Sequence, residues 1–140
     1  MSSSADFLKQ TPLFSGLTDD EIATVLATAK RRTYDKGTEI IHEGHVGGAG
    51  FYLVLSGVVD VSAHGTYLAT HSAGGYFGEM ALLLDDTPRT ASCVAAEDTV
   101  CLVITKWDLR SLVETHPEVS MKIMAELARR LRDTNQVVGD

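Results

Sequence analysis

The sequence has few of the residues that cross-link a chain or attract polyanions. It contains 2 cysteines and 1 tryptophan in 140 residues, and 19 aspartates and glutamates outnumber 12 lysines and arginines, for a formal net charge of −7. An acidic chain is repelled by DNA, RNA and anionic membranes. The composition therefore argues against direct nucleic-acid binding and against attachment to a charged membrane surface.

The sequence also lacks targeting and membrane signals. No basic and apolar leader precedes Asp6, and no apolar run reaches the length of a membrane span. We therefore expect a cytoplasmic protein, a compartment in which disulfides are uncommon. Cys93 and Cys101 lie in segments typical of strands, and buried free thiols are their expected state. A bridge between them across a hairpin stays open as an alternative.

The length and the apolar content of 44% predict one domain over residues 1–140 with its own core. Residues 1–5 read as a flexible tail and 6–30 as an N-terminal helical segment. Residues 31–104 show short apolar alternations separated by glycines, which is typical of a compact β-roll or jelly-roll barrel. The expected strands are Arg31–Tyr34, Glu39–His42, Gly50–Ser56, Val58–Ala63, Thr66–Ser72, Ser92–Ala95 and Thr99–Ile104.

Capping signals predict the flanking helices. Thr18 and Glu21 form a capping box, so a helix should begin there, and similar starts occur at Thr105 and Thr115. Residues 105–140 should be C-terminal helices. Their longest apolar stripe contains Val119, Ile123, Leu127 and Leu131, with Met121, Met124 and Ala128 widening it.

The most informative segment runs from Phe77 to Ser92: Phe-Gly-Glu-Met-Ala-Leu-Leu-Leu-Asp-Asp-Thr-Pro-Arg-Thr-Ala-Ser. A short helix starting after Gly78 would leave backbone N–H groups at its N-terminus, where an anion is favoured. Arg89 can donate two parallel hydrogen bonds to a phosphate. Glu79 would repel that phosphate unless it faced hydroxyl groups of the same ligand. These residues therefore predict a receptor for a sugar phosphate.

This segment resembles the phosphate-binding cassette of the cyclic nucleotide-binding domain family. The residues that match the family pattern are Phe77, Gly78, Glu79, Ala81, Leu82, Arg89, Thr90 and Ala91. The resemblance implies that Glu79 holds the ribose 2′-hydroxyl and Arg89 the cyclic phosphate, with main-chain N–H groups of Met80 and Ala81 beside them. It also implies a mainly β fold of about eight strands, in which the cassette is the one helical insertion.

The C-terminal segment adds a second resemblance. Residues 128–139 are similar to the long dimer helix of family members that activate transcription, and this match makes Thr134 and Asn135 candidates for contacting the base. It favours cyclic AMP over cyclic GMP, although Thr90 is compatible with both. The expected protein is thus a non-enzymatic sensor with no cofactor. It would relay binding through its C-terminal helices to an effector or partner protein, with a homodimer through the last helix as one option.

Two other readings stay open. A nucleotide-blind relative could use the same barrel as a scaffold for protein contacts, although the presence of both Glu79 and Arg89 argues against this. A cupin-like metalloenzyme could use His42, Glu43, His45 and His71, since imidazole and carboxylate are suitable metal ligands. However, the first three surround a tight turn and do not alternate along one strand, as cupin ligands do.

Overall fold

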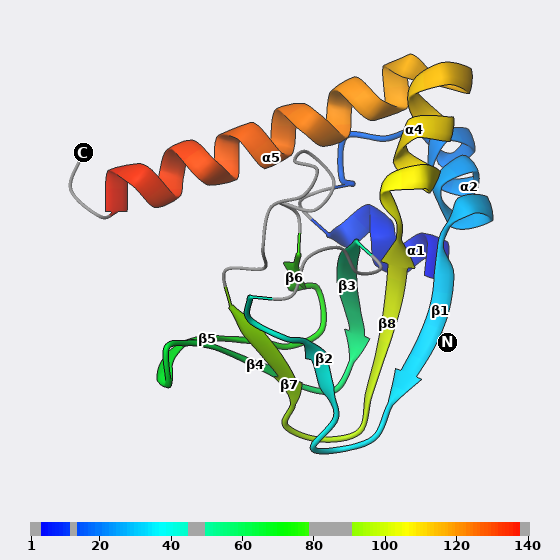
Figure 1. Cartoon of the computed structure of the whole chain (residues 1–140). Coiled ribbons are helices and arrows are strands. Elements are labelled where there is room, and N and C mark those ends of the chain that lie inside the picture. The colour runs from blue at the N-terminus through cyan, green and yellow to red at the C-terminus, as the bar shows by residue number, and fades with distance from the viewer. Residues whose placement is uncertain (1–3, 12–13, 45–49, 79–90, 138–140) are drawn as a thin grey trace. The chain divides into compact units, whose positions relative to one another are not determined.

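The computed structural model describes residues 4–11, 14–44, 50–78 and 91–137 (Figure 1). The chain divides into two compact units. We call Thr28–Asp108 the β unit, and we call Met1–Ala27 together with Leu109–Asp140 the helical unit. The single domain expected over the whole chain stays a prediction, and each unit is described by itself.

The β unit consists of two four-stranded antiparallel sheets (Figure 1). One sheet has the order β1-β8-β3-β6 and the other the order β2-β7-β4-β5. The strands are β1 (Lys30–Tyr34), β2 (Glu39–Ile41), β3 (Phe51–Ser56), β4 (Val59–Ala63), β5 (Thr66–His71), β6 (Tyr76–Phe77), β7 (Ser92–Ala95) and β8 (Thr99–Ile104). The predicted mainly β roll with flanking helices is confirmed.

One strand was missing from the sequence prediction. β6 contains only Tyr76 and Phe77, which pair with Leu53 and Tyr52 of β3. Two residues are too short to show an alternation of apolar and polar side chains, so periodicity cannot detect such a strand. The other seven strands begin and end within about one residue of their predicted bounds, which is the usual uncertainty of strand ends.

The core of the β unit lies between the two sheets. Its buried cluster takes side chains from both sheets: Ile41, Tyr52, Val54, Val59, Phe77, Cys93, Cys101 and Val103. Successive residues of a strand face opposite sides, and on β7 the alternate residues Cys93 and Ala95 are the buried ones. β3 and β8 are buried over most of their length. This packing brings together strands that are far apart in the sequence.

The two cysteines are free thiols buried in this core. Cys93 belongs to β7 and Cys101 to β8, and these strands lie in different sheets and do not pair. The hairpin that would have allowed a bridge is therefore absent, and the disulfide alternative is wrong. Burial raises the pKa of the Cys101 thiol to about 12, because the apolar surroundings disfavour a thiolate.

The helical unit contains α1 (Ser4–Gln10), α2 (Asp19–Thr28), α5 (Pro117–Val137) and most of α4 (Lys106–Thr115). Ser4 and Ala5 form the first turn of α1, so the helix begins inside the segment predicted as a tail. Within the described residues, none of the helices combines the length and the apolarity that crossing a lipid bilayer requires.

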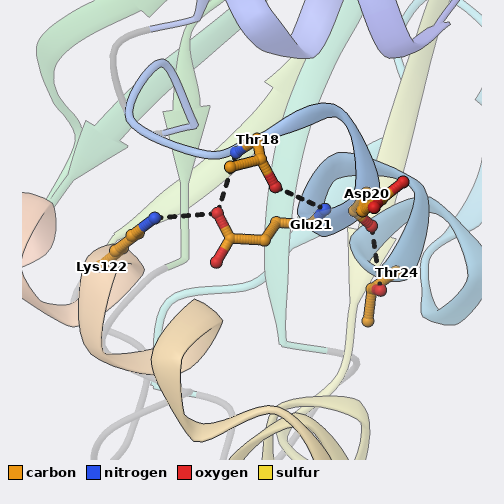
Figure 2. Close-up of polar contacts among 5 residues, drawn as sticks. All are labelled: Thr18, Asp20, Glu21, Thr24 and Lys122. Carbon is orange, nitrogen blue, oxygen red and sulfur yellow. Dashed lines mark hydrogen bonds and ion pairs between the residues drawn. The ribbon is translucent and has the colours of Figure 1, made fainter.

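The predicted capping box of α2 is present (Figure 2). The Thr18 N–H donates to Glu21 Oε1 at 2.8 Å, and the Glu21 N–H donates to Thr18 Oγ1 at 3.2 Å. Lys122 of α5 forms an ion pair with the same Glu21 oxygen at 2.8 Å. One carboxylate therefore both starts α2 and connects α2 to α5 within the helical unit.

The start of α4 agrees with its prediction, whereas the start of α5 differs. Thr105 and Asp108 bond reciprocally, as a capping box requires. Thr115, however, ends α4, and its hydroxyl donates to the Ser111 carbonyl. α5 instead begins at Pro117. Proline suits the first turn of a helix because it has no backbone N–H that would be left without an acceptor there. The apolar stripe of α5 is buried at Val119, Ile123 and Leu127, while Met121 is 63% exposed.

Candidate functional site

The candidate phosphate cassette starts from a well-anchored aromatic residue. Phe77 is 4% exposed, and its ring stacks on Tyr52 of β3 with centroids 5.1 Å apart and planes 6° apart. The His71 ring of β5 lies 5.8 Å from the same phenyl ring. Strands from both sheets therefore hold Phe77, the residue that precedes Gly78.

Gly78 turns the backbone out of β6 with a positive φ of 81°. This conformation is costly for residues with a side chain and is routine for glycine. The glycine of the Phe77-Gly78 pair is therefore required by the backbone at the point where the cassette leaves the sheet. A glycine here also permits the close approach of a ligand to the main chain.

The far end of the cassette enters the other sheet. Ala91 is half-buried and precedes β7, which begins at Ser92 and pairs with β4 at Ser62. Gly78 thus follows a strand of one sheet, and Ala91 precedes a strand of the other sheet. Both ends of the cassette are fixed to the sandwich that contains the core.

Several predicted site residues lie outside the described residues. They are Glu79, Met80, Ala81, Arg89 and Thr90. The backbone of Thr134 and Asn135 belongs to the last turns of α5, and their side chains are not described. The structure therefore places Phe77, Gly78 and Ala91 at the two ends of the cassette, and the roles of the other residues stay predictions.

A polar junction that sequence patterns do not predict lies beside the end of the cassette. The Glu43 N–H donates to Ser92 Oγ at 3.0 Å, and the Glu43 carboxylate accepts the His64 N–H at 2.9 Å. Its second oxygen lies 3.1 Å from His64 Nδ1. One residue thus joins the turn after β2, the β4–β5 hairpin tip and the start of β7. No local pattern indicates this, because the partners are 49 and 21 residues away in the sequence.

The candidate metal ligands are divided between separate pairs. His42 Nδ1 lies 2.7 Å from Glu39 Oε1, whereas Glu43 interacts with His64. His71 stacks on Phe77, and His45 lies outside the described residues. Across the described ranges, no three His, Cys, Asp or Glu side chains gather as a metal site would require.

The described residues also contain a shallow hollow of about 740 Å³, lined by Glu39, Ile40, His42, Glu43 and Gly44. It lies along β2 and the turn that follows, and neither Gly78 nor Ala91 lines it. A phosphate ligand is not favoured there, because the side chains that line the hollow include two carboxylates and no lysine or arginine.

Comparisons with known proteins agree with this architecture. The family model of the cyclic nucleotide-binding domain matches residues 31–116. The cyclic AMP receptor protein of Thermus thermophilus is 39% identical over 133 residues, covering 91% of this chain and 61% of that protein. Human cGMP-dependent protein kinase 2 is 33% identical over 135 residues, covering 91% of this chain and 18% of the kinase.

A solved structure shows the same fold. It is the N-terminal domain of a transcriptional regulator from Streptomyces coelicolor, with a TM-score of 0.81, 31% identity and 95% coverage of both chains. This chain therefore belongs to the cyclic nucleotide-binding domain family, a family of regulatory domains. It spans less than two thirds of the length of both curated relatives described above.

Proposed function

We propose that this chain is a regulatory domain that binds a cyclic mononucleotide between Gly78 and Ala91, with cyclic AMP preferred over cyclic GMP. Glu79 holds the ribose 2′-hydroxyl, Arg89 holds the cyclic phosphate, and main-chain N–H groups of Met80 and Ala81 contact the sugar-phosphate. Thr90 lies beside the phosphate, and Thr134 and Asn135 contact the base.

The observation that carries this proposal is the backbone at Gly78. Its positive φ directly follows a buried aromatic residue, and the next residue in the sequence is Glu79. Arg89 is ten positions after Glu79 in the sequence, and the segment containing both starts at one sheet and ends at the other. A segment whose two ends lie on the two sheets can present a carboxylate and a guanidinium to one small ligand.

The proposal predicts a large loss of affinity in Arg89→Ala. A buried phosphate left without its charged partner loses about 2–5 kcal/mol, which corresponds to at least about thirtyfold in affinity. Isothermal titration calorimetry with cyclic AMP measures the change. Thermal unfolding of both proteins without ligand shows whether the fold is retained.

Arg31→Ala is the matched control for this experiment. It removes the same guanidinium from an exposed strand of the β unit. Its affinity for cyclic AMP should stay close to that of the unchanged chain. Equal affinities of all three proteins would contradict the assignment of Arg89. A chain that folds and binds no cyclic nucleotide at all would be the nucleotide-blind scaffold.

The preference for cyclic AMP is tested by titrating cyclic AMP, cyclic GMP and 5′-AMP in parallel. The Thermus relative is named as a cyclic AMP receptor and the human relative as a cGMP-dependent kinase, so family membership supports either base. The C-terminal resemblance of Thr134 and Asn135 tilts the proposal toward adenine. Thermal shifts should follow the same order of ligands, because a ligand that binds only the folded state stabilises it by mass action.

Binding is relayed through the C-terminal helices to an effector domain or a partner protein. A ligand can shift these helices only if it binds one arrangement better than another. Met121, 63% exposed on α5, is an apolar side chain available to a partner or to a second copy. Hydrogen exchange of residues 117–138 should slow or quicken on addition of nucleotide, and unchanged protection there would contradict the relay.

We also propose that the protein is cytoplasmic. A cytoplasmic location is compatible with the buried free thiols Cys93 and Cys101. Direct DNA binding is not part of the proposed activity, since the net charge of −7 opposes association with a polyanion. The chain acts as a sensor and carries out no reaction of its own in this proposal.

A further inference from the structure

The β unit has a basic strand at the edge of one sheet. Lys30, Arg31 and Arg32 are consecutive in β1, and this strand is the outer member of the order β1-β8-β3-β6. Their side chains and that of Thr33 are exposed, whereas Tyr34 is half-buried against the core. An edge strand directs the N–H and C=O groups of every second residue away from its sheet, where another strand can pair with them.

The charge of β1 contrasts with that of the whole chain. The sequence has a net charge of −7, yet β1 holds three positive charges and no negative one. Within the described ranges, no ion pair joins Lys30, Arg31 or Arg32 to an acidic side chain. The nearest acidic residue in sequence is Asp35, beyond the Tyr34 end.

The positive charges lie on both faces of the strand. Lys30 and Arg32 project from one side of the sheet and Arg31 from the other, because successive residues of a strand face opposite sides. A partner strand beside β1 would meet a cation on each face at neighbouring positions. Acidic residues that are consecutive along an extended peptide satisfy this arrangement, because cross-strand neighbours of opposite charge stabilise pairing.

A second copy of the same strand does not fit. Antiparallel pairing of β1 with itself would place Lys30, Arg31 and Arg32 opposite or diagonal to one another, and like charges across a strand pair are destabilising. Charged edge strands resist self-association for this reason. The same charges that reject a copy of β1 attract an acidic strand from another protein.

We propose that β1 is a docking edge for an extended acidic segment of a partner protein, which adds to the sheet as a strand outside Lys30–Tyr34. Backbone hydrogen bonds would supply the pairing, and the lysine and the two arginines would select acidic side chains. This proposal does not depend on nucleotide binding. It assigns a second surface to the β unit, separate from the cassette between Gly78 and Ala91.

The other outer strands of the two sheets provide an internal comparison. β2, β5 and β6 also lie at sheet edges, and none of them contains lysine or arginine. β5 is similar in length to β1, with 6 residues against 5, and is exposed along much of its length. It is therefore a matched edge that should not accept the acidic segment.

The test uses a dye-labelled peptide with a run of glutamates flanked by threonine and valine, residues that favour extended backbone. Fluorescence anisotropy with the whole chain at low ionic strength should show saturable binding. A peptide of the same sequence with every backbone nitrogen of the glutamate run methylated keeps its charges and loses the N–H donors of both strand edges. We expect it to bind at least about tenfold more weakly.

Two double variants distinguish an effect of the charges on β1 from an effect of the net charge of the chain. Arg31→Ala with Arg32→Ala removes two positive charges from β1, and Thr66→Glu with Leu68→Glu makes the same change in net charge on exposed positions of β5. The β1 variant should lose about tenfold or more in affinity, and the β5 variant should bind nearly as the unchanged chain does. Circular dichroism checks the fold of both.

Four results would overturn the proposal. They are an absence of peptide binding, equal affinity for the methylated peptide, equal losses in the two double variants, and displacement of the peptide by a single-stranded oligonucleotide that binds more tightly. The methylated peptide is tested on the unchanged chain, so the proposal can fail even if a variant does not fold.

Discussion

Gly57 occupies the turn between β3 and β4, where the backbone leaves no room for a side chain. Its φ is 95°, and a Cβ at this position would lie 2.5 Å from both the Asp98 carbonyl oxygen and Thr99 Oγ1. Thr99 is itself buried, and its hydroxyl donates to the Val58 and Glu97 carbonyls. Relief of the contact would have to disturb this turn and the start of β8.

We expect Gly57→Ala to lower the free energy of unfolding by about 2–4 kcal/mol, since a strained φ and a backbone contact both add to the cost. Gly37→Ala is the control, because Gly37 has a similar φ of 92° and no atom within 4 Å of the added Cβ. It should cost only about 1–2 kcal/mol. Urea unfolding of both variants measures the difference, and equal losses would show that the contact with residues 98 and 99 has no effect.

At the scale of the element, the capping box at Thr18 stabilises the start of α2. Thr18 and Glu21 satisfy two N–H groups at the start of α2, and Glu21 also pairs with Lys122 of α5. The hydrogen bond from Lys122 and the one from the Thr18 N–H lower the pKa of Glu21 below its ordinary value. The stabilisation from Glu21 is therefore present at neutral pH and decreases as the carboxylate is protonated in acid.

Thr18→Ala should destabilise the protein by about 1 kcal/mol, the usual cost of a lost N-cap. Thr24→Ala serves as the control, because Thr24 lies inside the same helix and its hydroxyl only donates to the Asp20 carbonyl (Figure 2). Alanine favours helix at such a position, so this change should be close to neutral. Thermal unfolding at neutral pH compares the two. A smaller loss in Thr18→Ala than in Thr24→Ala would be inconsistent with the capping role.

At the scale of the whole molecule, the buried Cys101 and the half-buried Tyr34 should limit stability in alkali. Burial raises the pKa of Cys101 from 9.0 to about 12, and burial with the nearby Tyr52 and Cys101 raises that of Tyr34 from 10.0 to about 12. The folded chain keeps these protons to higher pH than the unfolded chain does. The free energy of unfolding should therefore fall as pH rises from about 9 toward 12.

Two conservative variants test the source of this dependence. Tyr34→Phe and Cys101→Ala each remove one titrating group, so each should make the alkaline decline of stability less steep. Urea unfolding measured across this pH range gives the slopes. Slopes identical to that of the unchanged chain would show that other groups control the decline.

Much of the fold could be predicted because the signals are local. Alternating apolar residues, turn glycines and capping boxes act within a few residues, so the strands β3, β4 and β8 and the starts of α2 and α4 were found with small errors. The pattern that predicts the candidate cassette is also local, since one continuous segment contains Gly78, Glu79 and Arg89. The resemblance to the cyclic nucleotide-binding domain family is carried by that segment.

Other features depend on which distant segments meet. The two-residue strand β6 exists because β3 pairs with it, and Cys93 and Cys101 share a core while belonging to different sheets. Glu43 reaches both His64 and Ser92 only after the sheets assemble.

Sequence patterns were thus sufficient for the longer strands and helices and for the mainly β class, because neighbouring residues encode these features through periodicity and backbone preference. The sugar-phosphate site that the same patterns indicate stays a prediction. The pairing order of the strands, the junction at Glu43 and the position of three basic residues at a sheet edge came from the folded chain alone. These features arise from long-range strand pairing, because only the pairing order decides which strand lies at the edge of a sheet.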